Sequence, residues 1–322
     1  MAVEVGGYRI SLDTGDPEAN VSFVSHAHSD HISGLRKDSR IIASKATRDL
    51  IAVRNRKELD IVDGIEQVKL LNSGHILGSK QLYVESADFG HSLVYSGDYQ
   101  MQECSVADRI ETRQADIAVI DSTYPYPKVK FDDRSEVVDS IQTYVNSKLE
   151  RGVVLFGAYT LGKAQELTKI MNNIGVLPVV DDRISRINKV YERSGVELQY
   201  TSQLDDKDTC ERIMRGNFVG IVNVSRLDSA RCEFQAKLGK RVFTAVATGW
   251  AKIFKFNTDV QFALSDHADF CQALDYINAC GAKLVYTYGE NRWLFARNLK
   301  KLGYNALPLA KAEPISRKVA DR

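Results

Sequence analysis

The sequence predicts an α/β protein in which one domain is inserted into another. Residues 1–122 are rich in short apolar strands, whereas the chain after Pro127 alternates apolar runs with helical segments. This alternation is typical of βαβ units and of a parallel sheet. Residues 261–322 return to strand, helix, strand and helix. We therefore expect the two ends of the chain to form one domain that the middle of the chain interrupts.

The individual elements are expected where the hydrophobic periodicity changes. The first part of the chain has strands at 8–12, 21–25, 40–44, 67–71, 81–85, 92–96 and 117–121, and one helix at 45–55. In the middle, a long amphipathic stretch at 133–149 precedes strands at 153–157, 177–180, 218–224 and 241–246. The helices there lie at 162–173, 185–194, 205–215 and 226–238. The last part has strands at 261–264 and 283–287 and helices at 268–279 and 292–302.

The composition is that of a globular protein of about two domains, at roughly 150 residues each. Hydrophobic residues make up 44% and charged residues 26% of the 322 residues, and the formal net charge is +1. Any binding of nucleic acid must therefore come from a local basic surface. Residues 1–7 show no secretory signal, no apolar run approaches ~18 residues, and the five cysteines have no Cys-x-x-Cys spacing. These features predict a cytoplasmic protein with no membrane partner.

Residues 26–31 read His-Ala-His-Ser-Asp-His and contain three of the six histidines of the chain. They follow an apolar run at 21–25 that is expected to be a strand. If the chain stays extended, His26 and His28 point to the same face. Neutral imidazoles and a carboxylate are ligands that suit zinc or a similar divalent ion. The cluster predicts a metalloenzyme, and the alternative is a polar loop with incidental histidines.

Three later segments repeat the arrangement of an apolar strand, a small residue and then a residue that can bind a metal. They end in His75, Asp98 and His267. Strand ends on a rigid scaffold are where preorganised ligands are expected. Each segment alone would more often be structural, but with the first cluster they account for five of the six histidines. The sixth, His91, is expected at the surface.

These residues together resemble a known family. The motif His-x-His-x-Asp-His, a later lone histidine after glycine, and Ser-Gly-Asp are similar to the metallo-β-lactamase fold. The segments Asp-Ser-Thr-Tyr at 121–124 and Ser-Asp-His-Ala-Asp at 265–269 resemble its β-CASP nuclease branch. Residues 95–99, 158–165 and 264–270 are most similar to the ligase-associated DNA exonucleases and the cross-link repair nucleases. The resemblance covers about residues 21–307.

This resemblance implies a fold and a domain division. The fold is a metallo-β-lactamase αββα sandwich with an inserted β-CASP α/β domain. The sandwich would take residues 1–124 and 255–322, and the inserted domain residues 125–254.

The resemblance also implies a site with two divalent metal ions, expected to be zinc. One ion is held by three histidines and the other by a carboxylate and a histidine, with one aspartate bridging them. Asp121 is expected to orient a ligand imidazole, and His267 to contact the scissile phosphate or protonate the leaving oxygen. Asp30 is expected to take part in catalysis as well as in metal binding. The metal ligands are His26, His28 and His75 for the first ion, Asp30 and His31 for the second, and Asp98 for both.

One position departs from the family pattern. Many members carry a histidine after the last strand that helps to bind the second metal, whereas this chain has Tyr288 there. A neutral phenol is a poor zinc ligand, so we expect the second metal to bind more weakly or only with substrate present. Manganese or magnesium could also occupy it. The cross-link repair branch lacks this histidine too.

Three further residues are expected to contact the substrate. Residues 157–164 fit the phosphate loop Gly-x4-Gly-Lys-[Ser/Thr] except that Ala164 replaces the hydroxyl residue that binds Mg²⁺, so triphosphatase activity is not expected. Lys163 at a helix N-terminus still suits a nucleic-acid phosphate, and the alternative is an ordinary helix start. Ser265 and Tyr288 are the other two expected contacts.

The resemblance implies a metal-dependent nuclease, in first place a DNA exonuclease that acts from the 5′ end on single strands. An RNA-processing nuclease of the mRNA 3′-end type is the nearest alternative. A non-catalytic subunit that binds nucleic acid with the same fold is a further alternative. Proteins of DNA repair or RNA processing are the expected partners.

Overall fold

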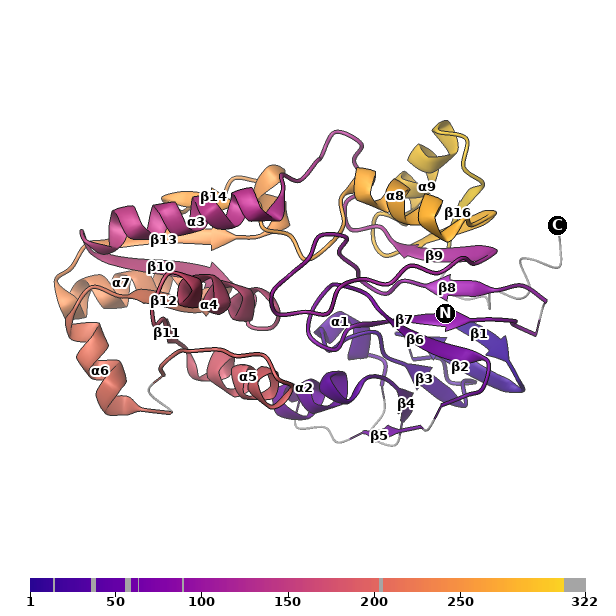
Figure 1. Ribbon diagram of the computed structural model, residues 1–322, viewed down its shortest axis with the longest axis horizontal. Coiled ribbons are helices and arrows are strands. Elements are labelled where there is room, and N and C mark those ends of the chain that lie inside the picture. Colours follow the sequence, from indigo (N-terminus) through magenta and orange to yellow (C-terminus); the bar gives the residue numbers. More distant parts are fainter. Residues whose placement is uncertain are drawn as a thin grey trace. The chain divides into compact units, whose positions relative to one another are not determined.

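The computed structural model describes residues 1–13, 15–35, 39–55, 59–62, 64–88, 90–202 and 205–309, and these form two compact units (Figure 1). The first unit comprises Met1–Glu103, Ala107–Lys130 and the described part of His267–Arg322. The second comprises Cys104–Val106 and Phe131–Asp266. Residues 310–322 of the predicted sandwich lie outside the described residues. None of the described helices has the length and apolar character that a bilayer crossing needs.

The first unit contains two sheets. One has the order β1-β2-β3-β4-β5, in which β1 and β2 are antiparallel and the other pairs are parallel. Its strands are β1 (Ala2–Val5), β2 (Tyr8–Leu12), β3 (Val21–Phe23), β4 (Arg40–Ile42) and β5 (Asp60–Ile61). The other has the order β16-β15-β9-β8-β7-β6. Its strands are β6 (Val68–Asn72), β7 (Lys80–Val84), β8 (Leu93–Tyr95), β9 (Ile117–Asp121), β15 (Leu284–Tyr288) and β16 (Ala306–Pro308).

A shared hydrophobic core joins the two sheets of the first unit. Because side chains alternate along a strand, β8 directs Leu93 and Tyr95 into this core and Val94 to the opposite face. On that opposite face, Val94 packs in a cluster with residues of α8 (Phe270–Cys280) and α9 (Arg292–Lys301). Two further helices, α1 (Ser29–Ile32) and α2 (Lys45–Asn55), follow β3 and β4 in the chain.

The second unit is built on a parallel sheet with the order β11-β12-β10-β13-β14. Helices cover both faces, since Val154 of β10 packs in a cluster with α3, α4 and α5, whereas Val153 packs in a cluster with α6 and α7. The strands are β10 (Val153–Ala158), β11 (Val179–Val180), β12 (Val219–Asn223), β13 (Val242–Ala247) and β14 (Val260–Phe262). The helices are α3 (Arg134–Leu149), α4 (Lys163–Asn173), α5 (Asp182–Arg193), α6 (Lys207–Arg215) and α7 (Leu227–Leu238), with 3₁₀ turns η1 (Val224–Arg226) and η2 (Gly249–Lys252).

The α/β class and the parallel sheet of the middle part are confirmed. The short elements β1, β5, β16 and α1 are additions that the sequence patterns do not predict. The strand expected at 261–264 corresponds to β14, which pairs with β13 and so completes the sheet of the second unit. The sequence pattern assigned this strand to the C-terminal part of the chain, because a short apolar run does not indicate which strand it pairs with. The assignment of the two units to the predicted domains, with limits at 124/125 and 254/255, stays a prediction.

Candidate metal centre

The potential metal ligands of the first unit lie at strand ends. The strands β6, β8, β9 and β15 run in one direction, because β7 is antiparallel to both β6 and β8, and β8, β9 and β15 pair in parallel. Their carboxyl ends therefore lie at the same edge of the sheet. His75 follows β6, Asp98 follows β8, and Asp121 ends β9. His26 and His28 lie in the segment between β3 and α1.

Among the residues that the structure describes, two groups of side chains could each hold a metal ion, and they share the carboxylate of Asp98. Each residue of a group offers one nitrogen or oxygen atom as a ligand, and these ligand atoms all lie within 4.8 Å of one another. The first group is His26, His28, His75 and Asp98, and the second is Asp98, Asp121 and His267.

The first group has the chemistry of a site for a divalent metal ion. His28 Nδ1 lies 3.0 Å from His26 Nε2 and 3.2 Å from His75 Nε2. Asp98 Oδ2 lies 3.4 Å from His26 Nε2 and 3.8 Å from His75 Nε2. Burial, followed by the neighbouring histidines, holds the pKa of His26 well below its usual value, so its imidazole is neutral. Three imidazoles and a carboxylate that converge in this way fit a divalent metal ion.

His31 contacts the same oxygen of the shared carboxylate as His26 does. Its Nε2 lies 3.2 Å from Asp98 Oδ2, and its Nδ1 lies 2.8 Å from Asp13 Oδ2. Burial alone would lower the pKa of His31, but the carboxylates of Asp98 and Asp13 raise it well above its usual value. Asp30 exposes 80% of its side chain, and its Oδ2 lies 3.5 Å from His31 Nε2. The structure thus brings His31 to Asp98 and leaves Asp30 facing solvent, and the metal and catalytic roles of Asp30 stay predictions.

Asp13 is a buried residue of the site that the sequence motifs do not identify. It follows β2 with a positive φ of 54°, a conformation that is uncommon for a residue other than glycine. Its Oδ1 accepts a hydrogen bond from the backbone N–H of Ser25 at 2.7 Å, and its Oδ2 accepts one from the Tyr95 hydroxyl at 2.8 Å. Because Oδ2 also binds His31 Nδ1, Asp13 turns His31 Nε2 toward Asp98. The one sequence signal is its position after an apolar strand.

His267 is held by Asp121. Its Nδ1 lies 3.0 Å from Asp121 Oδ2, and its Nε2 lies 4.0 Å from Asp98 Oδ2. Asp121 Oδ1 accepts hydrogen bonds from the backbone N–H and the hydroxyl of Thr123, at 3.0 and 2.8 Å. The carboxylate is therefore fixed at both oxygens, and it sets the orientation of the His267 ring. The segment Asp-Ser-Thr supplies this arrangement locally.

Tyr288 ends β15 beside the shared carboxylate. Its hydroxyl lies 3.4 Å from Asp98 Oδ1, at the outer limit of a hydrogen bond. Its ring packs against Tyr95 with a centroid distance of 5.0 Å. Burial, followed by the nearby acidic groups, raises the pKa of Tyr288 well above its usual value, so the phenol keeps its proton. A protonated phenol at this place donates to Asp98 and is a weak metal ligand.

Lys163 and Ser265 belong to the second unit, where both are buried. The Lys163 ammonium group lies 2.7 Å from Glu166 Oε2 and 2.6 Å from Asp266 Oδ1. Arg134 donates a hydrogen bond to the backbone carbonyl of Ser265 at 2.8 Å. Lys163 thus lies between two carboxylates of its own unit, and substrate binding by Lys163 and Ser265 stays a prediction. His91, expected at the surface, is exposed.

Comparisons with known proteins identify relatives, although no protein-family model matches the chain. The chain is 30% identical over 312 residues to a "Probable DNA ligase" of Opitutus terrae. This match covers 92% of this chain and 29% of that protein. It is 27% identical over 201 residues to an "RNase J-like protein" of Methanocaldococcus jannaschii, and the match covers 51% of this chain and 47% of that protein. It is 27% identical over 172 residues to the "DNA cross-link repair 1A protein" of Mus musculus, and the match covers 48% of this chain and 16% of that protein. The resemblance to the β-CASP nucleases is confirmed.

The chain spans less than half of the length of each of these relatives. A crystal structure of a protein of unknown function from Enterococcus faecalis matches with a TM-score of 0.60 at 14% identity, covering 93% of this chain and 81% of that chain. At this identity the likeness concerns the fold alone.

We expect Asp13→Ala to weaken binding of the second metal ion, for which His31 is an expected ligand, about 10- to 100-fold, as the loss of a partner that orients a ligand histidine does in other metal sites. The measurement is the zinc dissociation constant from competition with a chromogenic chelator. Glu18→Ala, which removes a carboxylate whose side chain is 75% exposed, is the control and should leave the constant unchanged. Equal constants for Asp13→Ala and the wild type would contradict the role of Asp13.

Gly74→Ala should lower the free energy of unfolding by more than about 1 kcal/mol, because a side chain is strained there. Gly74 has a φ of +78°, and a Cβ atom would lie 2.2 Å from the carbonyl oxygen of Gln100. Urea unfolding followed by circular dichroism measures the effect. Gly64→Ala is the matched control, since a Cβ there meets nothing within 4 Å. A Gly74→Ala protein as stable as Gly64→Ala would show that the turn before His75 tolerates a side chain.

Proposed function

We propose that this chain is a metal-dependent nuclease that hydrolyses nucleic-acid phosphodiesters, with a metallo-β-lactamase αββα sandwich and an inserted β-CASP domain. The observation that carries the proposal is the sharing of Asp98 by two groups of potential metal ligands. In this proposal the first unit is the sandwich and the second unit is the inserted domain. The free cysteines agree with the reducing environment of a cytoplasmic location.

The residues that would hold the metal ions fit zinc. His26, His28, His75 and Asp98 would bind the first ion. His31 and Asp30 would bind a second and weaker ion, for which manganese or magnesium could substitute. When bound, such ions supply a nucleophile at neutral pH and stabilise charge on the phosphate oxygens.

The side chains around the metal ligands have defined tasks in this proposal. Asp121 accepts the Nδ1 proton of His267 and so fixes the ring tautomer, which directs Nε2 toward the side of Asp98. From there His267 can contact the scissile phosphate or give a proton to the leaving oxygen. Asp13 holds His31 in the same manner. Tyr288, Lys163 and Ser265 remain proposed substrate contacts.

The preferred substrate is single-stranded DNA, degraded from the 5′ end. The relatives named "Probable DNA ligase" and "DNA cross-link repair 1A protein" support DNA. An "RNase J-like protein" and a "Transcription termination factor FttA" among the relatives favour RNA as the second candidate. Partners from DNA repair or RNA processing are proposed on the same grounds.

We expect His28→Ala to reduce cleavage by about 10³-fold or more, because a lost metal contribution of several kcal/mol has that effect on a rate. The assay digests single-stranded DNA and RNA of one sequence, labelled at either end. His91→Ala removes an exposed histidine outside both ligand groups and is the matched control.

The outcomes of this assay separate the candidates. Release of mononucleotides from the 5′ end of DNA supports the preferred function, and internal cuts in RNA with DNA intact support the second candidate. A zinc-loaded protein that cuts neither substrate is a non-catalytic subunit, and the nuclease proposal then fails.

A further inference from the structure

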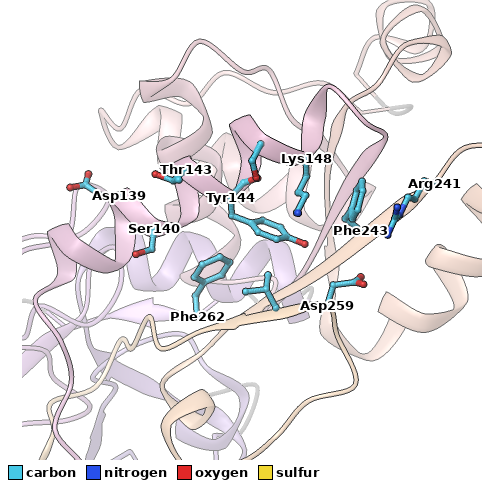
Figure 2. Close-up of a pocket in the computed structure, with 11 residues that line it drawn as sticks. Asp139, Ser140, Thr143, Tyr144, Lys148, Arg241, Phe243, Asp259 and Phe262 are labelled. Atoms are coloured by element: carbon cyan, nitrogen blue, oxygen red, sulfur yellow. The ribbon is translucent and has the colours of Figure 1, made fainter.

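The second unit contains an open groove that the metal centre does not use. It lies between α3 and the strands β13 and β14 and has a volume of about 760 Å³ (Figure 2). Aromatic, cationic, hydroxyl and acidic side chains line it together. The lining residues that carry the inference are Tyr144, Lys148, Arg241, Phe243, Asp259 and Phe262.

The cations of the groove gather around one aromatic ring. The guanidinium carbon of Arg241 lies 4.6 Å from the centroid of Phe243, and Lys148 Nζ lies 5.5 Å from it. Arg151, beyond the lining residues, lies 5.9 Å from the same centroid. Cation–π contacts hold these groups in place without neutralising them. Among the described residues none of the three forms an ion pair with a carboxylate, so their N–H groups remain able to bind an anion.

Tyr144 adds a buried donor beside these cations. Its hydroxyl oxygen is buried and makes no hydrogen bond with any described residue, and such a group costs free energy when it has no partner. Burial, followed by Asp259, raises the pKa of Tyr144 to about 12, so the hydroxyl keeps its proton. Figure 2 shows the hydroxyl directed along the groove toward Asp259. The ring meets Phe262 edge to face at 5.8 Å.

Asp259 supplies the acceptor of the groove. One of its oxygens accepts hydrogen bonds from the backbone N–H and the hydroxyl of Thr244, at 2.7 and 2.8 Å. These bonds fix the carboxylate on the groove wall. The groove therefore presents an aromatic wall, a donor and an acceptor side by side, next to a cationic end.

We propose that this groove, whose lining includes none of the potential metal ligands, binds a nucleotide unit of a single nucleic-acid strand. Lys148 and Arg241 would contact the backbone phosphate. The base would lie against the rings of Tyr144 and Phe262 and form hydrogen bonds with the Tyr144 hydroxyl and Asp259. A planar aromatic ring that carries both donors and acceptors, joined to a phosphate, matches this set of groups.

A strand fits better than a free nucleotide for two reasons. The positive charge continues past the groove to Arg151, which suits a chain of phosphates more than a single one. The groove is also open along α3 and has no glycine-rich loop to enclose a terminal phosphate. The inference extends the proposed function, because it assigns a second contact for the same class of substrate.

The test measures the binding of a fluorescent single strand with phosphorothioate linkages to the zinc-loaded, full-length protein by anisotropy. We expect Lys148→Glu and Arg241→Glu each to raise the dissociation constant about 10-fold and to reduce the slope of log K against log salt by about 1. Lys207→Glu makes the same charge change on α6, outside the groove lining, where the lysine side chain is 70% exposed. It should change the constant less than about 2-fold.

Tyr144→Phe separates a binding role from a structural one. It deletes a hydroxyl without a partner, so the melting temperature should stay equal or rise, while the dissociation constant should rise about 3- to 10-fold from the loss of one hydrogen bond to the ligand. Unchanged constants and salt slopes in all three groove variants would overturn the inference. The inference would also be overturned if a nucleoside monophosphate or a polyglutamate peptide displaced the fluorescent strand at concentrations as low as those at which an unlabelled strand displaces it.

The two proposals can fail independently. If no nucleic acid is cut but binding still depends on Lys148 and Arg241, the nuclease proposal fails and the groove proposal stands. If cleavage depends on His28 but binding ignores the groove variants, the groove proposal fails and the nuclease proposal stands.

Discussion

The site of this protein depends on one buried carboxylate, that of Asp98. Burial opposes its ionisation, but His31, His267 and His26 around it hold its pKa well below the usual value, so it stays charged. A buried charge needs such partners, and in return it fixes where their nitrogens point. The parallel arrangement of β6, β8 and β9 makes this possible, because it brings the loops that follow them to one edge of the sheet. The arrangement of the strands therefore places the side chain of Asp98 where the surrounding histidines can contact it.

Much of this candidate site could be predicted from the sequence, because potential metal ligands at strand ends form a local pattern. His26, His28, His75 and Asp98 follow apolar strands, and the structure places their donor atoms together. Asp13 was not predicted, because its role depends on contacts with Ser25, Tyr95 and His31 that exist only in the folded chain. β14 was predicted as a strand but its pairing was not, because pairing is decided by tertiary contacts.

The second unit shows why a positive residue in a motif is not by itself a phosphate site. Lys163 stands at a helix start that suits an anion, but Glu166 and Asp266 already surround its ammonium group. Lys148 and Arg241 belong to no motif, yet an aromatic ring positions them and no carboxylate of the described chain pairs with them. Only the folded structure distinguishes cations that are neutralised internally from cations that can bind a ligand.

The most direct test of the central role of Asp98 is the zinc content of Asp98→Asn, measured by mass spectrometry of the purified full-length protein. This substitution keeps the size of the side chain and removes the negative charge that both ligand groups share. We expect the wild type to retain at least one zinc ion per chain, and the variant, with an unchanged far-ultraviolet spectrum, to retain almost none. A folded variant with the zinc content of the wild type would contradict the account.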